Sequence, residues 1–236
     1  MIKGKRILGV ITARGGSKSI PKKNIVNLNG RPLIAYAIKA IRESKLVDEK
    51  IVSTDDLEIT KTALKYGAKV PFLRPKPLAT DTAKSVDVLI HALREMERIN
   101  RQKYDYILCL QPTNPFITGK DIDAAIKLMV KKRGDSAASV YCLDDFHPAK
   151  IKIIKNGWLT DYLMKEESGQ RRQDYPGVYK RNGGIFLTKR EILFKRRVLG
   201  KKIAPYLMPA ERSLDINNYF DLELAGFFLK KIKNAP

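Results

Sequence analysis

The sequence has little cysteine and little histidine. It holds only two of each, Cys109, Cys142, His91 and His147, in 236 residues. Each cysteine lies within a short apolar run of the kind that forms strands, so we interpret both as small buried side chains. The two histidines are isolated from one another, and His91 falls within a helical pattern. We therefore expect neither a disulfide nor a metal site built on histidine or cysteine.

Long apolar runs are also missing. No run approaches the ~18 apolar residues that a membrane-spanning helix needs. Residues 1–6 lead into a run of strand length and not into the apolar region of a signal peptide. We expect a cytoplasmic protein with no membrane partner.

Acidic residues are scarce beside basic ones. The chain has 25 Asp and Glu against 46 Lys and Arg, a formal net charge of +21. Such a charge attracts polyanions, whether nucleic acid, anionic membrane or phosphorylated small molecules. The basic residues are spread along the whole chain, without a block of five like charges or an aromatic-rich basic stripe. Solvated lysine faces explain such a pattern, so we do not expect nucleic acid as the main partner, although the field can help to recruit an anionic substrate.

Short apolar runs alternate with segments of helical period, which is typical of a sheet covered by helices. The pattern predicts strands at 7–11, 50–54, 104–110, 136–143, 183–187 and 203–208, and helices at 31–41, 84–100, 121–132 and 219–230. We expect one α/β domain over residues 1–236. The pattern breaks at 144–180 into polar turns with glycine and proline, and a long excursion of this kind usually serves function or an interface.

The most distinctive stretch is the basic loop at residues 13–24, ARGGSKSIPKKN, directly after the first strand. Its glycines let backbone N–H groups approach an anion closely, and Arg14, Lys18 and Lys23 can bind phosphate oxygens. The spacing matches neither the Walker A loop nor the G-x-G-x-x-G motif. The loop therefore predicts phosphate binding, with a solvated basic turn as the alternative.

Polar clusters follow two further strands, at 53–56 (STDD) and 111–115 (QPTNP). In open α/β sheets, ligands bind beyond the carboxyl ends of the strands, so three such clusters favour one shared crevice. Helix capping would also explain Thr54 and Asp55, and it would explain Asp81 or Thr82 before the next helix. Asp215, near the last helix, could hold Mg²⁺ together with a phosphate, whereas Asp221 suits a helix cap.

Taken together, these stretches resemble the acylneuraminate cytidylyltransferases, also called CMP-sialic acid synthetases. The matching pieces occur in the family's order and span almost the whole chain, at 13–24, 53–56, 74–81, 110–115, 171–174 and 182–185. The resemblance implies a Rossmann-like nucleotidyltransferase fold, with a mostly parallel sheet between helices. It also implies that CTP is joined to a nonulosonic acid (N-acetylneuraminate, legionaminate or pseudaminate) to give a CMP-sugar and pyrophosphate, with Mg²⁺ as cofactor.

The resemblance also implies roles for individual residues. Arg14, Ser17, Lys18 and Lys23 would bind the triphosphate beside the backbone of Ala13 and Gly15, with Asn24 near the ribose. Arg74 and Ser85 would contact the base, and Gln111 would bind the sugar. Arg172 and Gln173 would reach the sugar across a homodimer interface, which would make 144–180 a dimerisation and sugar-binding arm.

The sequence departs from the family at its metal site. The family usually shows Asp-Ile-Asp near the last helix, and here the second acid is Asn217, so Asp215 is left as the main protein ligand. We expect weaker metal binding. The motifs leave open which nonulosonic acid is the substrate. A cytidylyltransferase for the eight-carbon acid of lipopolysaccharide is the alternative enzyme, and a basic nucleic-acid-binding protein is the alternative from another class.

Overall fold

The computed structural model describes residues 2–143, 146–163, 171 and 175–233. A six-stranded sheet in the order β10-β6-β9-β5-β1-β4 forms the centre of the molecule. All neighbouring strands are parallel except β9, which is antiparallel to both β5 and β6. The strands are β1 Ile7–Thr12, β4 Glu49–Ser53, β5 Tyr106–Leu110, β6 Ser136–Cys142, β9 Tyr179–Lys189 and β10 Ile203–Leu207.

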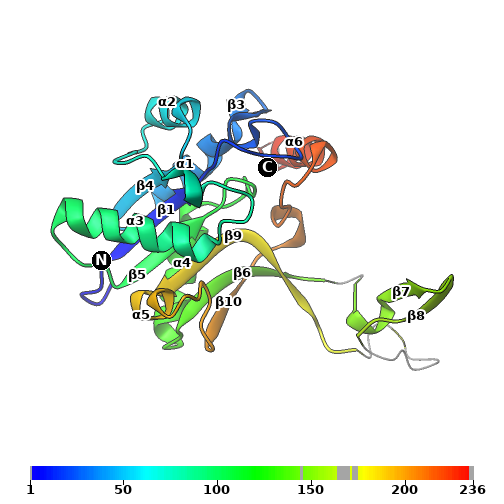
Figure 1. Cartoon of the computed structure of the whole chain (residues 1–236). Coiled ribbons are helices and arrows are strands. Elements are labelled where there is room, and N and C mark those ends of the chain that lie inside the picture. Colours follow the sequence, from blue (N-terminus) through cyan, green and yellow to red (C-terminus); the bar gives the residue numbers. More distant parts are fainter. Residues whose placement is uncertain (1, 144–145, 164–170, 172–174, 234–236) are drawn as a thin grey trace.

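Helices cover both faces of the sheet (Figure 1). One face packs on α1 (Leu33–Glu43), α2 (Leu57–Lys65) and α4 (Gly119–Lys131), and the other on α3 (Ser85–Asn100) and α5 (Arg190–Phe194). Side chains alternate along β1, so Ile7 and Ile11 enter the first core while Leu8 and Val10 enter the second. The fold expected from the alternating pattern is confirmed.

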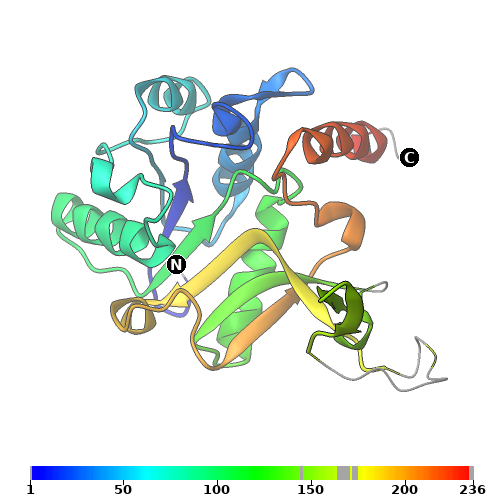
Figure 2. The ribbon, with the colours of Figure 1, turned by 45° about the vertical axis from the view of Figure 1, so that its right-hand side comes forward.

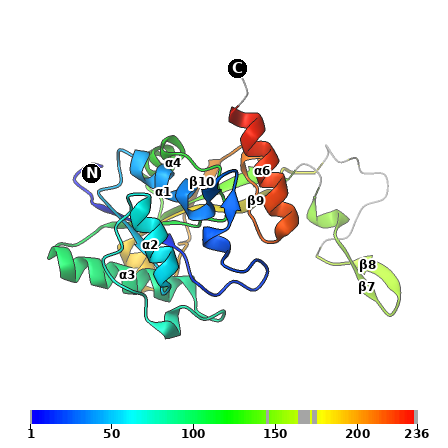
Figure 3. The same ribbon diagram turned by 90° about the horizontal axis from the view of Figure 1, so that it is seen from above.

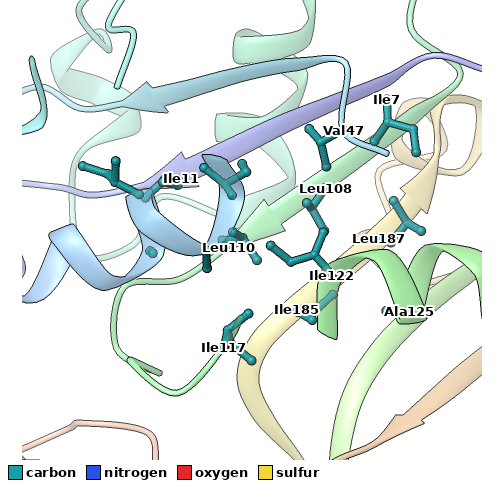
Figure 4. Close-up of a cluster of buried hydrophobic side chains, with 14 of the residues drawn as sticks. Ile7, Ile11, Val47, Leu108, Leu110, Ile117, Ile122, Ala125, Ile185 and Leu187 are labelled. Atoms are coloured by element: carbon teal, nitrogen blue, oxygen red, sulfur yellow. The ribbon is translucent and has the colours of Figure 1, made fainter. Parts of the chain in front are cut away.

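The first core lies between the sheet and helices α1, α2 and α4, and Figure 4 shows its side chains meeting between β1, β5, β9 and α4. Ile122, Ala125 and Ile126 have no exposed surface in it. α4 presents them because Thr118 and Asp121 form a reciprocal capping box at its start, where each side chain accepts the other's backbone N–H. This packing fixes the loops at the carboxyl ends of β1 and β5.

Two segments, residues 31–32 and 179–182, form strands that the predicted strand ranges do not include. The helix expected at 31–41 begins at Leu33, because Arg31 and Pro32 form β3, which pairs with β2 (Asn27–Leu28). The strand expected at 183–187 begins at Tyr179, so residues 179–182, of which 179 and 180 were expected in the excursion, belong to the sheet. Local pattern does not reveal these residues as strand, because their pairing partner is the distant end of β6.

A small hairpin of β7 (Lys152–Lys155) and β8 (Trp158–Asp161) lies away from the sheet. Figure 2 shows β9 as a long curved strand that leads from the sheet toward this hairpin. Ile154, Trp158 and Leu159 each expose about three quarters of their surface. The view from above in Figure 3 separates the hairpin from α6 (Tyr219–Lys233), which packs near β2 and β3. Within the described ranges, we find no helix with the length and apolar content that crossing a bilayer requires.

Candidate functional site

A cleft of about 510 Å³ opens at the carboxyl ends of β1 and β5. Residues from four separate parts of the sequence line it: the basic loop, residues 74–88, residues 111–113 after β5, and the segment before α6. It is the crevice that the strand-end clusters predict, since the carboxyl ends of parallel strands meet at one edge of the sheet. Ten of the predicted site residues line it: Arg14, Ser17, Lys18, Lys23, Asn24, Arg74, Ser85, Gln111, Asp215 and Asn217.

The basic loop is held to the sheet by backbone contacts. The Ala13 N–H donates to the Ser53 carbonyl at 3.1 Å, and the Gly15 N–H donates to Asp55 at 3.1 Å. A Cβ atom on Gly15 would lie only 2.6 Å from an Asp56 carboxylate oxygen, so glycine is needed for this close approach. Further along, the Asn24 amide donates to the Arg14 carbonyl at 2.9 Å. Ala13 and Gly15 therefore position the loop and do not line the cleft.

The two acids after β4, Asp55 and Asp56, have different roles. Asp56 caps α2 by accepting the Ile59 N–H at 2.9 Å, while Asp55 accepts from Gly15. Helix capping therefore explains Asp56, and Asp55 belongs to the support of the basic loop. The signal in the sequence was the pair of acids after a strand, which does not say which of the two faces the helix.

Arg14 and Lys18 meet an acid from the opposite wall of the cleft. One Asp81 oxygen lies 2.7 Å from an Arg14 guanidinium nitrogen, and the other lies 2.8 Å from the Lys18 ammonium. The hydrogen bond from Lys18 is the largest cause that holds the pKa of Asp81 below its usual value. Asp81 does not cap α3, whose N-cap residue is Lys84.

Lys23 faces the segment before α6. Its ammonium donates to the backbone carbonyls of Ile216 at 3.1 Å and Asn217 at 3.4 Å. Burial lowers the pKa of Lys23, and the nearby Asp215 carboxylate acts in the opposite direction. Lys22, its neighbour, instead pairs with Glu58 at 2.5 Å, and neither of these two lines the cleft.

Arg74 forms part of the buried floor. It is only 5% exposed, and it donates from Nε to the Ser53 hydroxyl at 3.2 Å and from its terminal nitrogen to the Ser53 carbonyl. Burial lowers the pKa of this guanidinium, and Asp55 opposes that shift. Ser85, the first residue of α3, and Gln111 also reach the cleft.

Asp215 has the most unusual surroundings among the acids of the cleft. Its Oδ1 atom is buried and has no hydrogen-bond partner among the described residues. Gly183 has a φ of +72°, and a Cβ there would come within 3.1 Å of the Asp215 carboxyl carbon. The Asn217 amide donates to the Asp215 backbone carbonyl at 3.0 Å. A buried carboxylate oxygen without a donor fits a cation ligand.

Asp221 takes part in capping α6, as its position suggested, as the first-turn partner of the cap residue Asn218. It accepts the N–H groups of Asn217 at 2.8 Å and Asn218 at 3.2 Å, and the Asn218 side chain accepts the Asp221 N–H at 2.9 Å. In the part of the chain that the structure describes, no group of three or more His, Cys, Asp or Glu could hold a metal ion. A cation at Asp215 would need oxygen ligands from a bound phosphate and water, which is the coordination that Mg²⁺ commonly takes.

A second cleft, of about 520 Å³, adjoins the first and shares Asp215 and Asn217 with it. It is also lined by Tyr141 from the end of β6, Lys180 and Arg181 from β9, and Phe228 from α6. No local pattern in the sequence marks these residues, because β9 reaches this point only through its pairing with the end of β6. The predicted sugar ligands Arg172 and Gln173 lie outside the described residues.

The chain matches the family model described as cytidylyltransferase over residues 8–216. It is 35% identical to the CMP-N,N'-diacetyllegionaminic acid synthase of Legionella pneumophila over 93% of this chain and 94% of that protein. It is 32% identical to a pseudaminic acid cytidylyltransferase of Campylobacter jejuni over 94% of this chain and 96% of that one.

One solved structure with the same fold is the CMP:2-keto-3-deoxy-manno-octonic acid synthetase complexed with CTP. It has a TM-score of 0.71 and 17% identity, and the match covers 97% of this chain and all of that one. At this identity the likeness establishes the Rossmann-like nucleotidyltransferase fold. The family model covers most of the chain, and the similar proteins match it almost from end to end, so the chain belongs to the cytidylyltransferase family of nucleotidyltransferases.

Proposed function

We propose that this enzyme transfers CMP from CTP to a nonulosonic acid and releases pyrophosphate. The observation that carries the proposal is the pair of adjoining clefts with Asp215 between them. The first cleft supplies the cations that a triphosphate needs, and the second is a separate volume for an acceptor. An acceptor held there lies beside the phosphate at which the reaction takes place.

The reaction is an in-line displacement at phosphorus. The anomeric hydroxyl oxygen of the sugar forms a bond to the α-phosphorus of CTP, the bond from that phosphorus to the α–β bridging oxygen breaks so that pyrophosphate leaves, and the hydroxyl proton passes to water. Arg14, Lys18 and Lys23 offset the negative charge that moves onto the leaving pyrophosphate. Their attachment to a loop pinned at Ala13, Gly15 and Asn24 lets them act in fixed positions.

Asp215 would hold Mg²⁺ in this cleft. Its partnerless buried oxygen fits that role, and Asn217 could add a neutral oxygen ligand. When bound, the ion would offset charge on the triphosphate. With only one carboxylate from the chain, we expect modest affinity for the metal until the nucleotide supplies its own oxygens.

The base and the sugar are assigned to opposite ends of the paired clefts. Arg74 and Ser85 would contact the cytosine end, because they lie on the side of α3, and Asn24 would lie near the ribose. Gln111, at the carboxyl end of β5, would contact the sugar, and Lys180 and Arg181 are cations suited to its carboxylate. Arg172 and Gln173 are assigned to the sugar by resemblance to the family alone.

We further propose a homodimer in the cytoplasm, with residues 144–180 as the arm that joins the two copies. The support is the hairpin β7–β8, which exposes Ile154, Trp158 and Leu159 away from the domain. Three large apolar side chains exposed together on one small hairpin are typical of an interaction surface. A second copy of the chain is the partner that the family resemblance implies.

The test is pyrophosphate release from CTP and Mg²⁺ against a panel of acceptors. The panel holds N-acetylneuraminate, legionaminate, pseudaminate and the eight-carbon 3-deoxy-manno-octulosonate. We expect release with at least one nine-carbon acid and formation of the matching CMP-sugar. Preference for the eight-carbon acid would favour the alternative enzyme. No release with any acid, together with tight binding of duplex nucleic acid, would overturn the enzyme assignment.

A further inference from the structure

Asp81 lies where the polyphosphate of a nucleotide would be expected to bind. It comes from residues 78–83, on the wall of the cleft opposite the basic loop, and its two carboxylate oxygens contact different cations. Oδ1 is 2.7 Å from Arg14, and Oδ2 is 2.8 Å from Lys18. A carboxylate that bridges two cations in this way uses the same charge-assisted geometry as a phosphate group.

The position of Asp81 is set by its own turn. The Ala83 N–H donates to the Thr80 carbonyl at 3.3 Å, which closes a turn around Asp81 directly before α3. The α3 N-cap is Lys84 and has no side-chain cap bond, so helix capping does not explain the acid. Since Lys18 holds the pKa of Asp81 below its usual value, the side chain is a carboxylate at neutral pH.

We propose that Asp81 is a positioning residue whose carboxylate orients Arg14 and Lys18 across the cleft and competes with polyphosphate for them. This inference rests on the proposed function, and it adds a part to the reaction cycle. A bound triphosphate contacts Arg14 and Lys18 either together with the Asp81 carboxylate or in its place. When pyrophosphate leaves, Asp81 recovers them, and this favours release of that product.

The physical reason is that two anions cannot both lie beside the same two cations without repulsion. Arg14 and Lys18 have further N–H groups, so the cations need not let go of Asp81 completely. The carboxylate and the phosphate oxygens would nevertheless be near neighbours of like charge, which disfavours the bound anion. Removing the charge of Asp81 while keeping its shape should therefore strengthen anion binding.

The variant Asp81→Asn tests this in the full-length chain. Inorganic pyrophosphate is the probe, and its binding is measured by isothermal titration calorimetry at fixed ionic strength. We expect Asp81→Asn to bind pyrophosphate about tenfold more tightly than the wild type, or about 1.4 kcal/mol. In the steady state, KM for CTP should fall and inhibition by pyrophosphate should strengthen, while kcat does not rise.

Glu58→Gln is the matched control. Glu58 pairs with Lys22 of the same loop at 2.5 Å, and neither residue lines the cleft. We expect this variant to bind pyrophosphate as the wild type does. An equal gain in pyrophosphate affinity in both variants would mean that the loss of any one negative charge near the loop has this effect. It would overturn a specific role for Asp81.

Unchanged or weaker pyrophosphate binding by Asp81→Asn would also overturn the inference. Its failure can be separated from failure of the proposed function. If the wild type forms a CMP-sugar and Asp81→Asn gains no affinity, only the role of Asp81 is wrong. If no CMP-sugar forms but the variant still binds pyrophosphate more tightly, the competition holds and the proposed reaction is wrong.

Discussion

The first cleft, which we propose binds the nucleotide and call the nucleotide cleft, and the β7–β8 hairpin are built in opposite ways. The cleft is made from strand ends and loops that the sheet holds in place: Arg74 donates to Ser53, the Gly15 N–H donates to the Asp55 carboxylate, and Lys23 donates to the Ile216 carbonyl. The hairpin contributes no residue to the three buried cores, and Trp158 exposes 77% of its surface. One chain thus builds the first cleft from its own sheet and loops, whereas the hairpin leaves large apolar side chains exposed.

Asp215 lies where the two clefts meet, so its replacement should have the largest effect. Asp215→Asn keeps the shape that packs against Gly183 but removes the charge beside both clefts. We expect kcat/KM for CTP to fall by roughly 10²-fold or more, the size seen when one electrostatic contact to a transition state is lost. Steady-state pyrophosphate release measures it. A change of less than about threefold would remove Asp215 from the reaction.

Replacement of Lys18 tests the exposed edge of the nucleotide cleft. Its side chain is 83% exposed, so its bond to an anion is more screened than that of the half-buried Lys23. Lys18→Ala should lower kcat/KM for CTP by roughly tenfold with an unchanged melting temperature. Kinetics equal to the wild type would show that the loop binds phosphate without this residue.

The arm should affect assembly more than nucleotide binding. Replacement of Trp158 and Leu159 by alanine removes exposed apolar surface without touching the buried core. We expect a shift from dimer to monomer in light scattering coupled to size-exclusion chromatography, a higher KM for the sugar, and little change in CTP affinity. A wild-type chain that is already a monomer would contradict the proposed arm, as would a variant that remains a dimer.

Asn217 offers the smallest and most specific change. Asn217→Asp adds a second carboxylate beside Asp215 and should lower the half-saturating Mg²⁺ concentration by a few-fold. The measurement is a Mg²⁺ titration at fixed CTP. An unaltered midpoint would mean that the metal does not bind at this segment.

The sequence predicted that the site residues share one cleft because each part of the cleft follows a strand or lies near the start of a helix. Arg14, Gln111 and Ser85 occupy such positions, and parallel strands bring these ends to one edge of the sheet. Local sequence patterns do not predict the contacts across the cleft. From the sequence alone, helix capping explains Asp81 and Asp55 as well as a role at the cleft does. Only the folded chain shows that they face the basic loop.

The second cleft could not be predicted for a different reason. Its cations Lys180 and Arg181 lie among the first residues of β9, and the predicted strand at 183–187 includes neither of them. Their place depends on antiparallel pairing with the end of β6, some forty residues earlier in the sequence, and on a register shift between Ala138 and Val140. Pairing at that separation is a tertiary property that periodicity does not encode.

The neighbouring lysines 22 and 23 allow the most direct test of the central claim, that cations facing the cleft perform the transfer. Lys23 reaches the cleft and the segment at Asp215, while Lys22 pairs with Glu58 outside it. The measurement is kcat/KM for pyrophosphate release from CTP by Lys23→Ala and Lys22→Ala. We predict a loss of roughly 10²-fold for Lys23→Ala and less than about twofold for Lys22→Ala, with both variants folded by circular dichroism. Equal losses in the two variants, or full activity of Lys23→Ala, would contradict the account.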